Sequence, residues 1–249
     1  MQEEILLEVK GLKKNFGDFP AVKGISFAVK KGEVLGFLGP NGAGKSTTMR
    51  MITGFIPPTE GTAVICGHDI VSDPIGAKAS FGYLPEAAPS YRAMTVTDFL
   101  TFIAKIRGYT GAEVGRRVEA AIQEANLTKV VNQTIETLSK GYRQRTCFAQ
   151  AILHDPQVLI MDEPTDGLDP NQKREVRNLI KAMAAKGKAI IISTHILEEV
   201  DAVCTRAIII AGGEIKANGT PAELRAHDPS GKGDLAGAFY HLTMDQEGK

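Results

Sequence analysis

The sequence has 249 residues, of which 43% are hydrophobic and 23% are charged, as is usual for a globular protein. Lys plus Arg and Asp plus Glu both number 29, so the net charge is zero and gives no indication of a nucleic-acid partner. No apolar run approaches the ~18–20 residues that span a membrane, and the three cysteines are scattered, so we expect a soluble intracellular protein without a disulfide framework.

The β-rich segments of the chain predict a layered α/β fold. Residues 5–9 and 25–29 are expected to pair as short antiparallel strands, and residues 34–38 read as a buried strand that runs into a glycine-rich turn. Almost continuous apolar runs, typical of parallel strands covered on both faces, follow at 158–161, 189–192 and 207–210.

Helical spacing dominates the rest of the chain. One helix is predicted between two of the apolar runs and is ended by Gly187; its apolar stripe consists of Val176, Leu179, Ile180 and Met183. The stretch from about residue 95 to residue 153 contains no convincing strand and two helical stripes, which predicts an inserted helical subdomain. A polar linker over 227–233 precedes a short pattern at 235–242.

Residues 39–47 match the phosphate-loop pattern G-x-x-x-x-G-K-[ST] and lie between a predicted strand and a predicted helix. Glycines let the backbone curl so that its N–H groups converge on phosphate oxygens, and the helix N-terminus adds partial positive charge. Lys45 can reach the outer phosphates and Ser46 can ligate Mg²⁺. The candidate nucleotide-binding residues here are Gly39, Pro40, Asn41, Gly42, Ala43, Gly44, Lys45, Ser46 and Thr47.

The strand at 158–161 continues into two acidic residues, Asp162 and Glu163. Asp162 is expected to hold the metal directly or through water, and Glu163 to polarise the attacking water as a general base. Adjacent acids after a strand are common in α/β proteins. Together with a phosphate loop, however, they indicate nucleotide hydrolysis.

The segment Leu-Ser-Lys-Gly-Tyr-Arg-Gln-Arg at 138–145 resembles the signature segment of ATP-binding cassette (ABC) ATPases. It lies between the phosphate loop and the acidic pair, as in that family. The other segments that resemble family motifs are 16–17 (an aromatic that stacks on adenine), 82–86 (the Q-loop), 163–170 (the acid and the D-loop) and 193–195 (the switch histidine). The resemblance covers essentially residues 4–226.

The resemblance implies a P-loop NTPase fold with a RecA-like α/β core, an antiparallel β subdomain and an inserted α-helical subdomain. The ABC ATPase domain would occupy residues 1–226, with the helical subdomain at about 87–153. A linker and a short C-terminal helix would follow over residues 227–249.

In that family two cassettes pair head to tail, and each ATP lies between the phosphate loop of one and the signature segment of the other. By resemblance, Phe16 would stack on adenine, and Ser139 and Gly141 would contact the γ-phosphate across the interface. His195 would read the γ-phosphate and orient the water. The implied catalytic residues are Glu163, His195 and Lys45, and the implied Mg²⁺ ligands are Ser46, Glu86 and Asp162.

The sequence departs from the family pattern at several positions. Glu86 stands where Gln is usual; a carboxylate can still ligate Mg²⁺ or order water, but it adds charge and cannot donate an amide hydrogen bond. Lys140 and Tyr142 replace the usual Gly and Gln of the signature, and Lys140 either adds positive charge near the partner's ATP or projects into solvent. Phe16 replaces the more frequent Tyr, which keeps stacking and removes the hydroxyl.

We therefore expect the ATP- and Mg²⁺-dependent ATPase subunit of an ABC transporter. The motifs look like export-branch cassettes, including those assigned to gliding motility and to copper-site maturation of nitrous oxide reductase. The expected partners are a transmembrane permease, docked near Tyr91 and the Glu86 loop, and a second cassette; the complete motif set favours a homodimer. The expected location is peripheral, on the cytoplasmic face of the inner or plasma membrane.

Three alternative functions can be compared with the sequence. A soluble ABC ATPase of translation usually carries two cassettes, and one of repair carries a long coiled coil; neither feature is present. A non-hydrolytic ATP-binding regulator would not need Glu163 and His195. A P-loop kinase or GTPase would leave the signature segment and the switch histidine unexplained.

Overall fold

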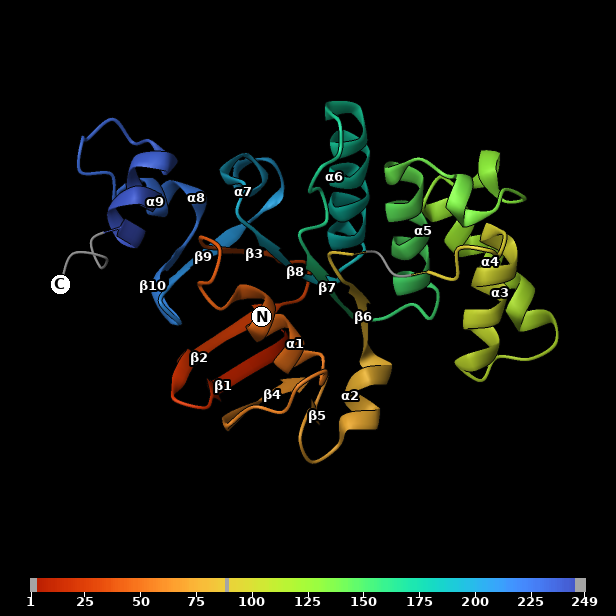
Figure 1. Ribbon diagram of the computed structural model, residues 1–249, viewed down its shortest axis with the longest axis horizontal. Coiled ribbons are helices and arrows are strands. Elements are labelled where there is room, and N and C mark those ends of the chain that lie inside the picture. The colour runs from red at the N-terminus through yellow and green to blue at the C-terminus, as the bar shows by residue number, and fades with distance from the viewer. Residues whose placement is uncertain (1–3, 88–89, 245–249) are drawn as a thin grey trace.

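The computed structural model describes residues 4–87 and 90–244, so parts of the predicted ranges, residues 1–3, 88–89 and 245–249, lie outside the described residues. The chain folds as two sheets with helices around them (Figure 1). A four-stranded sheet has the order β2-β1-β4-β5, and a six-stranded sheet has the order β10-β9-β3-β8-β7-β6. The predicted α/β class is therefore confirmed.

The six-stranded sheet forms the centre of the molecule. Its strands are β3 (Val34–Leu38), β6 (Phe81–Leu84), β7 (Val158–Asp162), β8 (Ala189–Thr194), β9 (Arg206–Ala211) and β10 (Glu214–Gly219). All pair in parallel except β10, which is antiparallel to β9. Every residue of β3, β7 and β8 is buried. The sheet is covered on both sides, so its central strands carry apolar side chains on both faces. This burial confirms the central strands that were predicted from the apolar runs.

The second sheet packs against one face of the first. The predicted segments near the N-terminus do pair antiparallel, but as longer strands, β1 (Ile5–Phe16) and β2 (Phe19–Lys30). Two further strands of this sheet, β4 (Glu60–Ile65) and β5 (His68–Asp69), were not predicted from the sequence. Helix α1 (Lys45–Ile52) lies between the two sheets, where Met49, Met51 and Ile52 are fully buried. Helix α2 (Pro74–Ser80) leads from β5 into β6.

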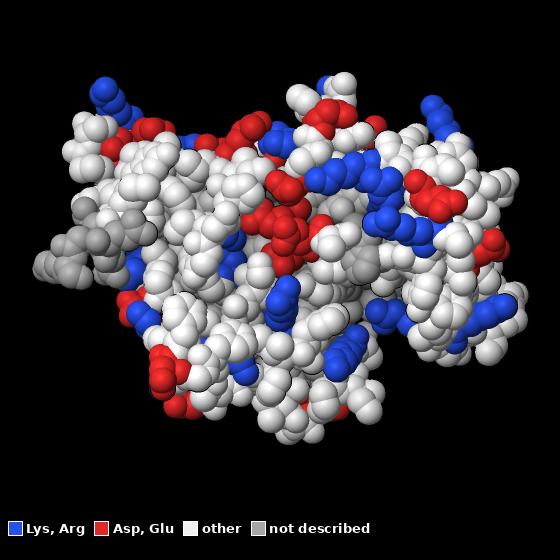
Figure 2. Space-filling model, viewed as in Figure 1, with Lys and Arg blue, Asp and Glu red and all other residues white. Residues whose placement is uncertain are grey.

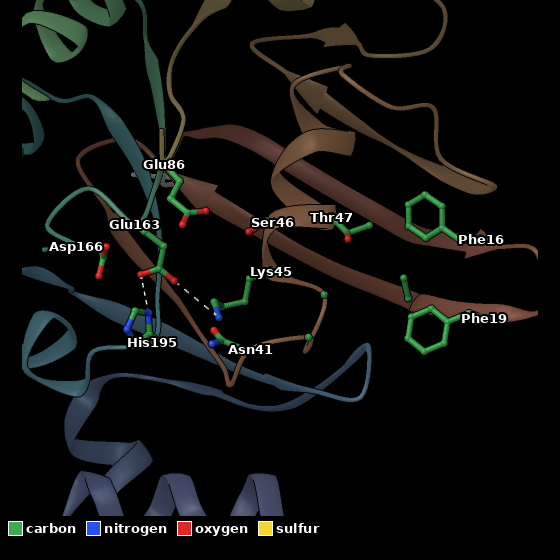
Figure 3. A pocket seen from close by; sticks show the side chains of 13 residues that line it. Phe16, Phe19, Asn41, Lys45, Ser46, Thr47, Glu86, Glu163, Asp166 and His195 are labelled. Atoms are coloured by element: carbon green, nitrogen blue, oxygen red, sulfur yellow. Dashed lines mark hydrogen bonds and ion pairs between the residues drawn. The ribbon is translucent and has the colours of Figure 1, made fainter. Parts of the chain in front are cut away.

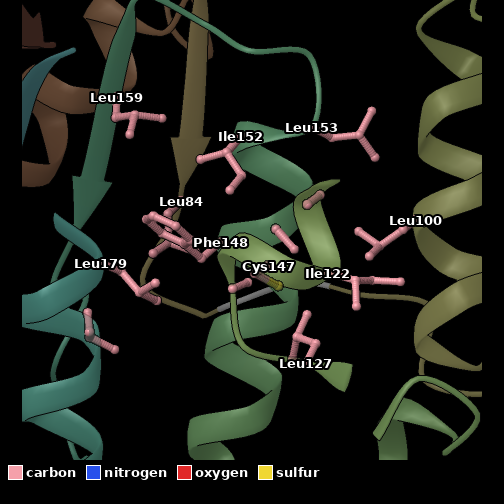
Figure 4. Close-up of a cluster of buried hydrophobic side chains, with 14 of the residues drawn as sticks. Leu84, Leu100, Ile122, Leu127, Cys147, Phe148, Ile152, Leu153, Leu159 and Leu179 are labelled. Atoms are coloured by element: carbon pink, nitrogen blue, oxygen red, sulfur yellow. The ribbon is translucent and has the colours of Figure 1, made fainter. Parts of the chain in front are cut away.

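A helical region packs beside the edge strand β6. It contains α3 (Val96–Ile106), α4 (Ala112–Glu124) and α5 (Lys140–Ile152), with short 3-10 turns at Thr128–Val130 and Ile135–Thr137. Figure 4 shows α5 between the strands and the outer helices, with Phe148 at the centre of the buried cluster. On α3, Phe99 is buried whereas Ile106, in the last turn, is 65% exposed.

The remaining helices cover the other face of the central sheet and its β9–β10 end. These are α6 (Pro170–Ala185), α7 (Leu197–Val203), α8 (Pro221–Arg225) and α9 (Leu235–Met244). The predicted end of α6 is confirmed at Gly187, whose φ of 84° suits a residue without a Cβ. The predicted C-terminal helix is also confirmed and extends to Met244. Within the described ranges, no helix combines the length and the hydropathy that a membrane span requires.

His154 follows α5 where it meets β6, and it makes stability depend on pH. Its Nε2 lies 3.0 Å from the carbonyl oxygen of Phe81 and donates to it. Burial lowers the pKa of His154 to about 4, with the charge of Arg107 acting in the same direction. The unfolded chain, with the ordinary pKa of 6.5, therefore binds a proton at a pH where the folded chain does not.

We predict that the folded state loses stability as pH falls from 6.5 to 4, because protonation of His154 favours the unfolded chain in that window. His154→Gln keeps a donor for Phe81 and does not titrate, so its unfolding free energy should change less over the window. Urea unfolding at several pH values measures this. The exposed His227, changed to Gln, is the control. An unaltered pH profile in His154→Gln would contradict the assignment.

Candidate functional site

One edge of the central sheet collects the predicted site residues. Because the strands are parallel, their carboxyl ends meet at the same edge. The phosphate loop follows β3, His195 follows β8, Glu163 follows β7, and Glu86 lies just beyond β6 (Figure 3). They surround a cavity of about 400 Å³ lined by Phe16, Phe19, Ala21, Asn41, Gly42, Gly44, Lys45, Ser46, Thr47, Glu86, Glu163, Asp166 and His195.

The phosphate loop is shaped by close backbone approaches. Gly44, at a φ of 100°, places a hypothetical Cβ only 2.7 Å from the carbonyl oxygen of Ala21, and one at Gly39 would come within 2.4 Å of the carbonyl oxygen of Ile210. Larger residues would clash with backbone at both positions, so the loop needs these glycines. The loop then leads into α1, whose first residue is Lys45.

Lys45 is the central cation of the site and is only 6% exposed. Its Nζ donates to the carbonyl oxygens of Gly39 at 2.7 Å and Pro40 at 3.2 Å, and lies 3.8 Å from Oε1 of Glu163. Burial lowers the pKa of Lys45, whereas the nearby charges, first that of Glu163, act in the opposite direction. The loop and the carboxylates therefore hold the ammonium group in place beside the cavity.

Glu163 is held in an unusual backbone conformation. Its φ is 49°, in the left-handed region that non-glycine residues seldom adopt, and its N–H donates to the carbonyl oxygen of Ser193 at 3.1 Å. This turn directs the side chain into the cavity, where Oε2 lies 2.9 Å from Nδ1 of His195. A carboxylate so placed can accept a proton from water, while the histidine fixes its orientation.

The oxygen atoms around Ser46 suit a magnesium ion. The Ser46 hydroxyl donates to Oδ1 of the buried Asp162 at 3.4 Å, and the Ser193 hydroxyl donates to the same oxygen. The Glu86 carboxylate faces the same region (Figure 3). Hydroxyl and carboxylate oxygens are the donors that Mg²⁺ prefers, with water and phosphate completing its shell. The predicted ligands Ser46, Glu86 and Asp162 therefore fit the ion chemically.

Carboxylates outnumber cations at the cavity. Glu86, Glu163 and Asp166 line it beside Lys45, with Asp162 beneath. Figure 2 shows the resulting acidic patch in the hollow at the centre of this face, with basic side chains next to it on the side of α5. A polyphosphate would be repelled by this charge, so a divalent cation is needed to offset it.

The signature residues lie apart from this cavity. Ser139 caps α5, accepting a hydrogen bond from the N–H of Tyr142 at 3.3 Å, and neither Ser139 nor Gly141 lines the cavity. A Cβ on Gly141 would come within 2.6 Å of Gln172, so glycine lets α5 pack closely on the start of α6. Lys140, about half exposed, lies with Nζ 3.7 Å from Oδ2 of Asp166.

Three cavity residues were missed by the sequence analysis: Phe19, Ala21 and Asp166. Phe19 and Ala21 lie on β2, which was predicted only over residues 25–29. The available signal was the Gly-Asp pair after Phe16, because such a pair between two strands is typical of a hairpin turn. Asp166 lies within the quoted segment 163–170 but had no role assigned.

Comparisons with known proteins agree with this geometry. A family model described as ABC transporter matches residues 22–166. The linearmycin resistance ATP-binding protein LnrL of Bacillus subtilis (strain 168) is 38% identical over 219 residues, which is 88% of this chain and 70% of that protein. The probable multidrug ABC transporter ATP-binding protein YbhF of Escherichia coli (strain K12) is 35% identical over 245 residues. This alignment covers 97% of the chain but 42% of YbhF, so the chain spans less than half of that relative.

Solved structures resemble the chain in fold as well as in sequence. A structure described as an ATP-binding subunit of an ABC transporter has a TM-score of 0.85 and 32% identity, covering 95% of this chain and 99% of its own. CbiO1 from Clostridium perfringens, described as part of the ABC transporter complex cbiONQ, has a TM-score of 0.81 and 30% identity, covering 90% and 92%. These neighbours confirm the predicted P-loop NTPase fold.

Lys45→Ala should lower the affinity for ATP by about 10- to 100-fold, because a buried, charge-assisted donor to phosphate is lost. Titration with a fluorescent ATP analogue measures the dissociation constant. Lys129→Ala, which removes an exposed lysine from a surface turn, is the matched control. Equal affinity in Lys45→Ala and the control would count against the phosphate-binding role.

Proposed function

The chain belongs to the ABC transporter family, and from this membership we propose that it is the ATP-hydrolysing, nucleotide-binding subunit that drives a separate membrane permease. The observation that carries the proposal is the convergence of Lys45, Glu163 and His195 on one cavity at the carboxyl edge of the parallel sheet. Phosphoryl transfer to water requires a cation that binds phosphate, a base that activates the water and a group that orients this base.

Each residue has a defined task in this mechanism. Lys45 and the N–H groups of the phosphate loop bind the outer phosphates. Glu163 takes the proton of the attacking water, and His195, 2.9 Å away, holds the carboxylate and contacts the γ-phosphate. Mg²⁺, held by Ser46 and Asp162 with Glu86 beside them, would neutralise charge on the β- and γ-phosphates. Hydrolysis removes the γ-phosphate from the nucleotide. The protein groups that bind the γ-phosphate are then no longer connected through it.

A second cassette completes the site in this proposal. Ser139 and Gly141 lie outside the cavity of their own chain, so they can contact a nucleotide only when it is bound by another chain. The Ser139 hydroxyl already accepts from Tyr142 and keeps its O–H free to donate to phosphate. The start of α5 adds partial positive charge. Head-to-tail pairing of two copies would supply both sites, which favours a homodimer.

A groove beside the Glu86 loop suits the permease. Its volume is about 540 Å³, and Phe55, Lys78, Tyr83, Pro85 and Arg107 are among the lining residues. Phe55 is 72% exposed and its ring centroid lies 5.8 Å from that of Tyr83. Since Pro85 directly precedes Glu86, a cytoplasmic helix of the permease seated here would touch the loop that carries a predicted Mg²⁺ ligand. Apolar anchors and a carboxylate would match the aromatic walls and the two cations.

The direction of transport is proposed to be export. The relatives are named for multidrug transport, linearmycin resistance and Nod factor export. Narrower assignment to cassettes of gliding motility or copper-site maturation remains a prediction from motif resemblance. The subunit would lie peripherally on the cytoplasmic face of the inner or plasma membrane, attached through the permease.

Glu163→Gln should retain ATP binding and lower steady-state hydrolysis by at least about 100-fold, because an amide cannot accept the proton of water. With ATP and Mg²⁺ it should accumulate as a dimer, measured by size-exclusion chromatography with light scattering. Asp166→Asn removes a carboxylate from the same cavity and is the matched control. Normal turnover in Glu163→Gln would refute its assignment as the base.

Phe55→Ser should abolish co-purification of the permease from detergent-solubilised membranes while leaving the basal ATPase rate of the isolated chain unchanged. The reason is that Phe55 is the most exposed aromatic of the groove and lies outside the nucleotide cavity. Tyr240→Ser, on α9, is the control for loss of an exposed aromatic. Permease recovery equal to that of the control would contradict the proposed docking surface.

A further inference from the structure

The backbone turn at Glu163 aims the carboxylate of the proposed base. Glu163 has a φ of 49°, and its Oε2 lies 2.9 Å from Nδ1 of His195 (Figure 3). A non-glycine residue stays in this region of backbone space only where its surroundings hold it. On the amino-terminal side, the N–H of Glu163 donates to the carbonyl oxygen of Ser193 at 3.1 Å. The turn needs an equivalent anchor on its carboxyl-terminal side.

Helix α5 supplies that anchor through the side chain of Gln144. Nε2 of Gln144 donates a hydrogen bond of 3.1 Å to the carbonyl oxygen of Pro164, the residue directly after Glu163. Gln144 is only 6% exposed, and Pro164 is buried as well. Proline has no N–H, so this carbonyl is the one hydrogen-bonding group of its backbone, and it can only accept. Removing the Gln144 amide takes this donor away from a buried acceptor.

The surroundings of Gln144 make α5 a firm support for the turn. Cys147 and Phe148 of the same helix are buried in the cluster between the central sheet and the outer helices. Arg145, the next residue, lies with Nη1 3.3 Å from Oε2 of Glu175 on α6. Helix α5 is therefore tied to the sheet and also to the helix that follows the Glu163 segment. The amide of Gln144 is presented to Pro164 from a fixed position.

Gln144 lies outside the nucleotide cavity and is not one of its lining residues. It can therefore affect hydrolysis only through the turn, and not by touching the nucleotide. The helix that carries it begins at the Ser139 cap, which meets the nucleotide of a second chain in the proposed function. The same helix would thus contact one nucleotide at its start and support the base of the other site from its interior.

We infer that Gln144 is a positioning residue for hydrolysis, which keeps the Glu163 carboxylate aimed at the attacking water by holding the carbonyl group of Pro164. This inference rests on the proposed function, in which Glu163 is the base. Loss of the hydrogen bond lets the turn relax and moves the carboxylate away from His195 and the water. A displacement of about 1 Å is enough to slow a reaction by about 100-fold. Lys45 and the phosphate loop follow β3 and do not use this hydrogen bond, so ATP binding is retained.

Gln144→Met removes the donor and keeps the length of the side chain. Its kcat for ATP hydrolysis should fall by about 10- to 100-fold, whereas KM and the dissociation constant of a fluorescent ATP analogue should not change. Gln144→Asn withdraws the amide by one methylene and should give the same result, which keeps the test valid should the methionine variant fail to fold. Urea unfolding identifies the folded variants. Gln123→Met, an exposed position on α4, is the matched control.

A Glu163→Gln background shows whether Gln144 acts through the base. Once the base is lost, adding Gln144→Met should leave the residual single-turnover rate unchanged, and a further loss as large as that in the wild-type background would overturn the inference. Wild-type kcat in folded Gln144 variants would also overturn it, as would a fall in kcat matched by a loss of ATP affinity, which a merely structural role produces. Failure of the proposed function has a different signature, because Glu163→Gln alone would then hydrolyse ATP at the normal rate.

Discussion

The buried ammonium group of Lys45 is the constraint on which the rest of the site depends. A charge that is only 6% exposed would be costly without partners, and it has them in two loop carbonyls and the Glu163 carboxylate. Those carbonyls face the ammonium group only because the loop curls through positions where a Cβ would strike backbone. The glycines, the lysine and the acid therefore form one unit, in which loss of any part leaves another polar group unpaired.

The parallel order of the central sheet brings this unit together. Residues far apart in sequence, such as Lys45, Glu163 and His195, follow strands β3, β7 and β8, and these strands lie side by side with their carboxyl ends at one edge. Alternate side chains of each strand pack into different clusters, as Leu159 and Ile160 do on β7. The burial that gives these strands their apolar sequences also makes the strand ends rigid enough to hold the side chains of the cavity in place.

The elements that the sequence predicts are those whose burial produces a simple pattern of apolar residues. Strands β3, β7, β8 and β9 were predicted because both of their faces are apolar, and helix α6 was predicted because it has one clear apolar stripe. Strands β4, β5, β6 and β10 were not predicted because they are short or rich in glycine and polar residues, and pairing with neighbouring strands fixes them instead. Phe19 was missed because the Gly-Asp turn after Phe16 was not recognised, and the place of Phe19 at the cavity depends on the cross-strand register that this turn sets.

The zero net charge of the chain conceals a separation of charge on one face. Carboxylates crowd the nucleotide cavity, and Lys140, at the start of α5, lies 3.7 Å from Asp166 at the cavity's border. Both partners of this pair are about half exposed, so solvent screens it and it contributes little to stability. A weak contact of this kind is easily exchanged for a stronger one. In the proposed head-to-tail dimer, a nucleotide phosphate bound by the second chain would carry more charge than Asp166 and would meet Ser139, which directly precedes Lys140. If such a dimer forms, Lys140, which replaces the usual glycine of the signature segment, would leave only a weak ion pair with Asp166 when it turns to that phosphate.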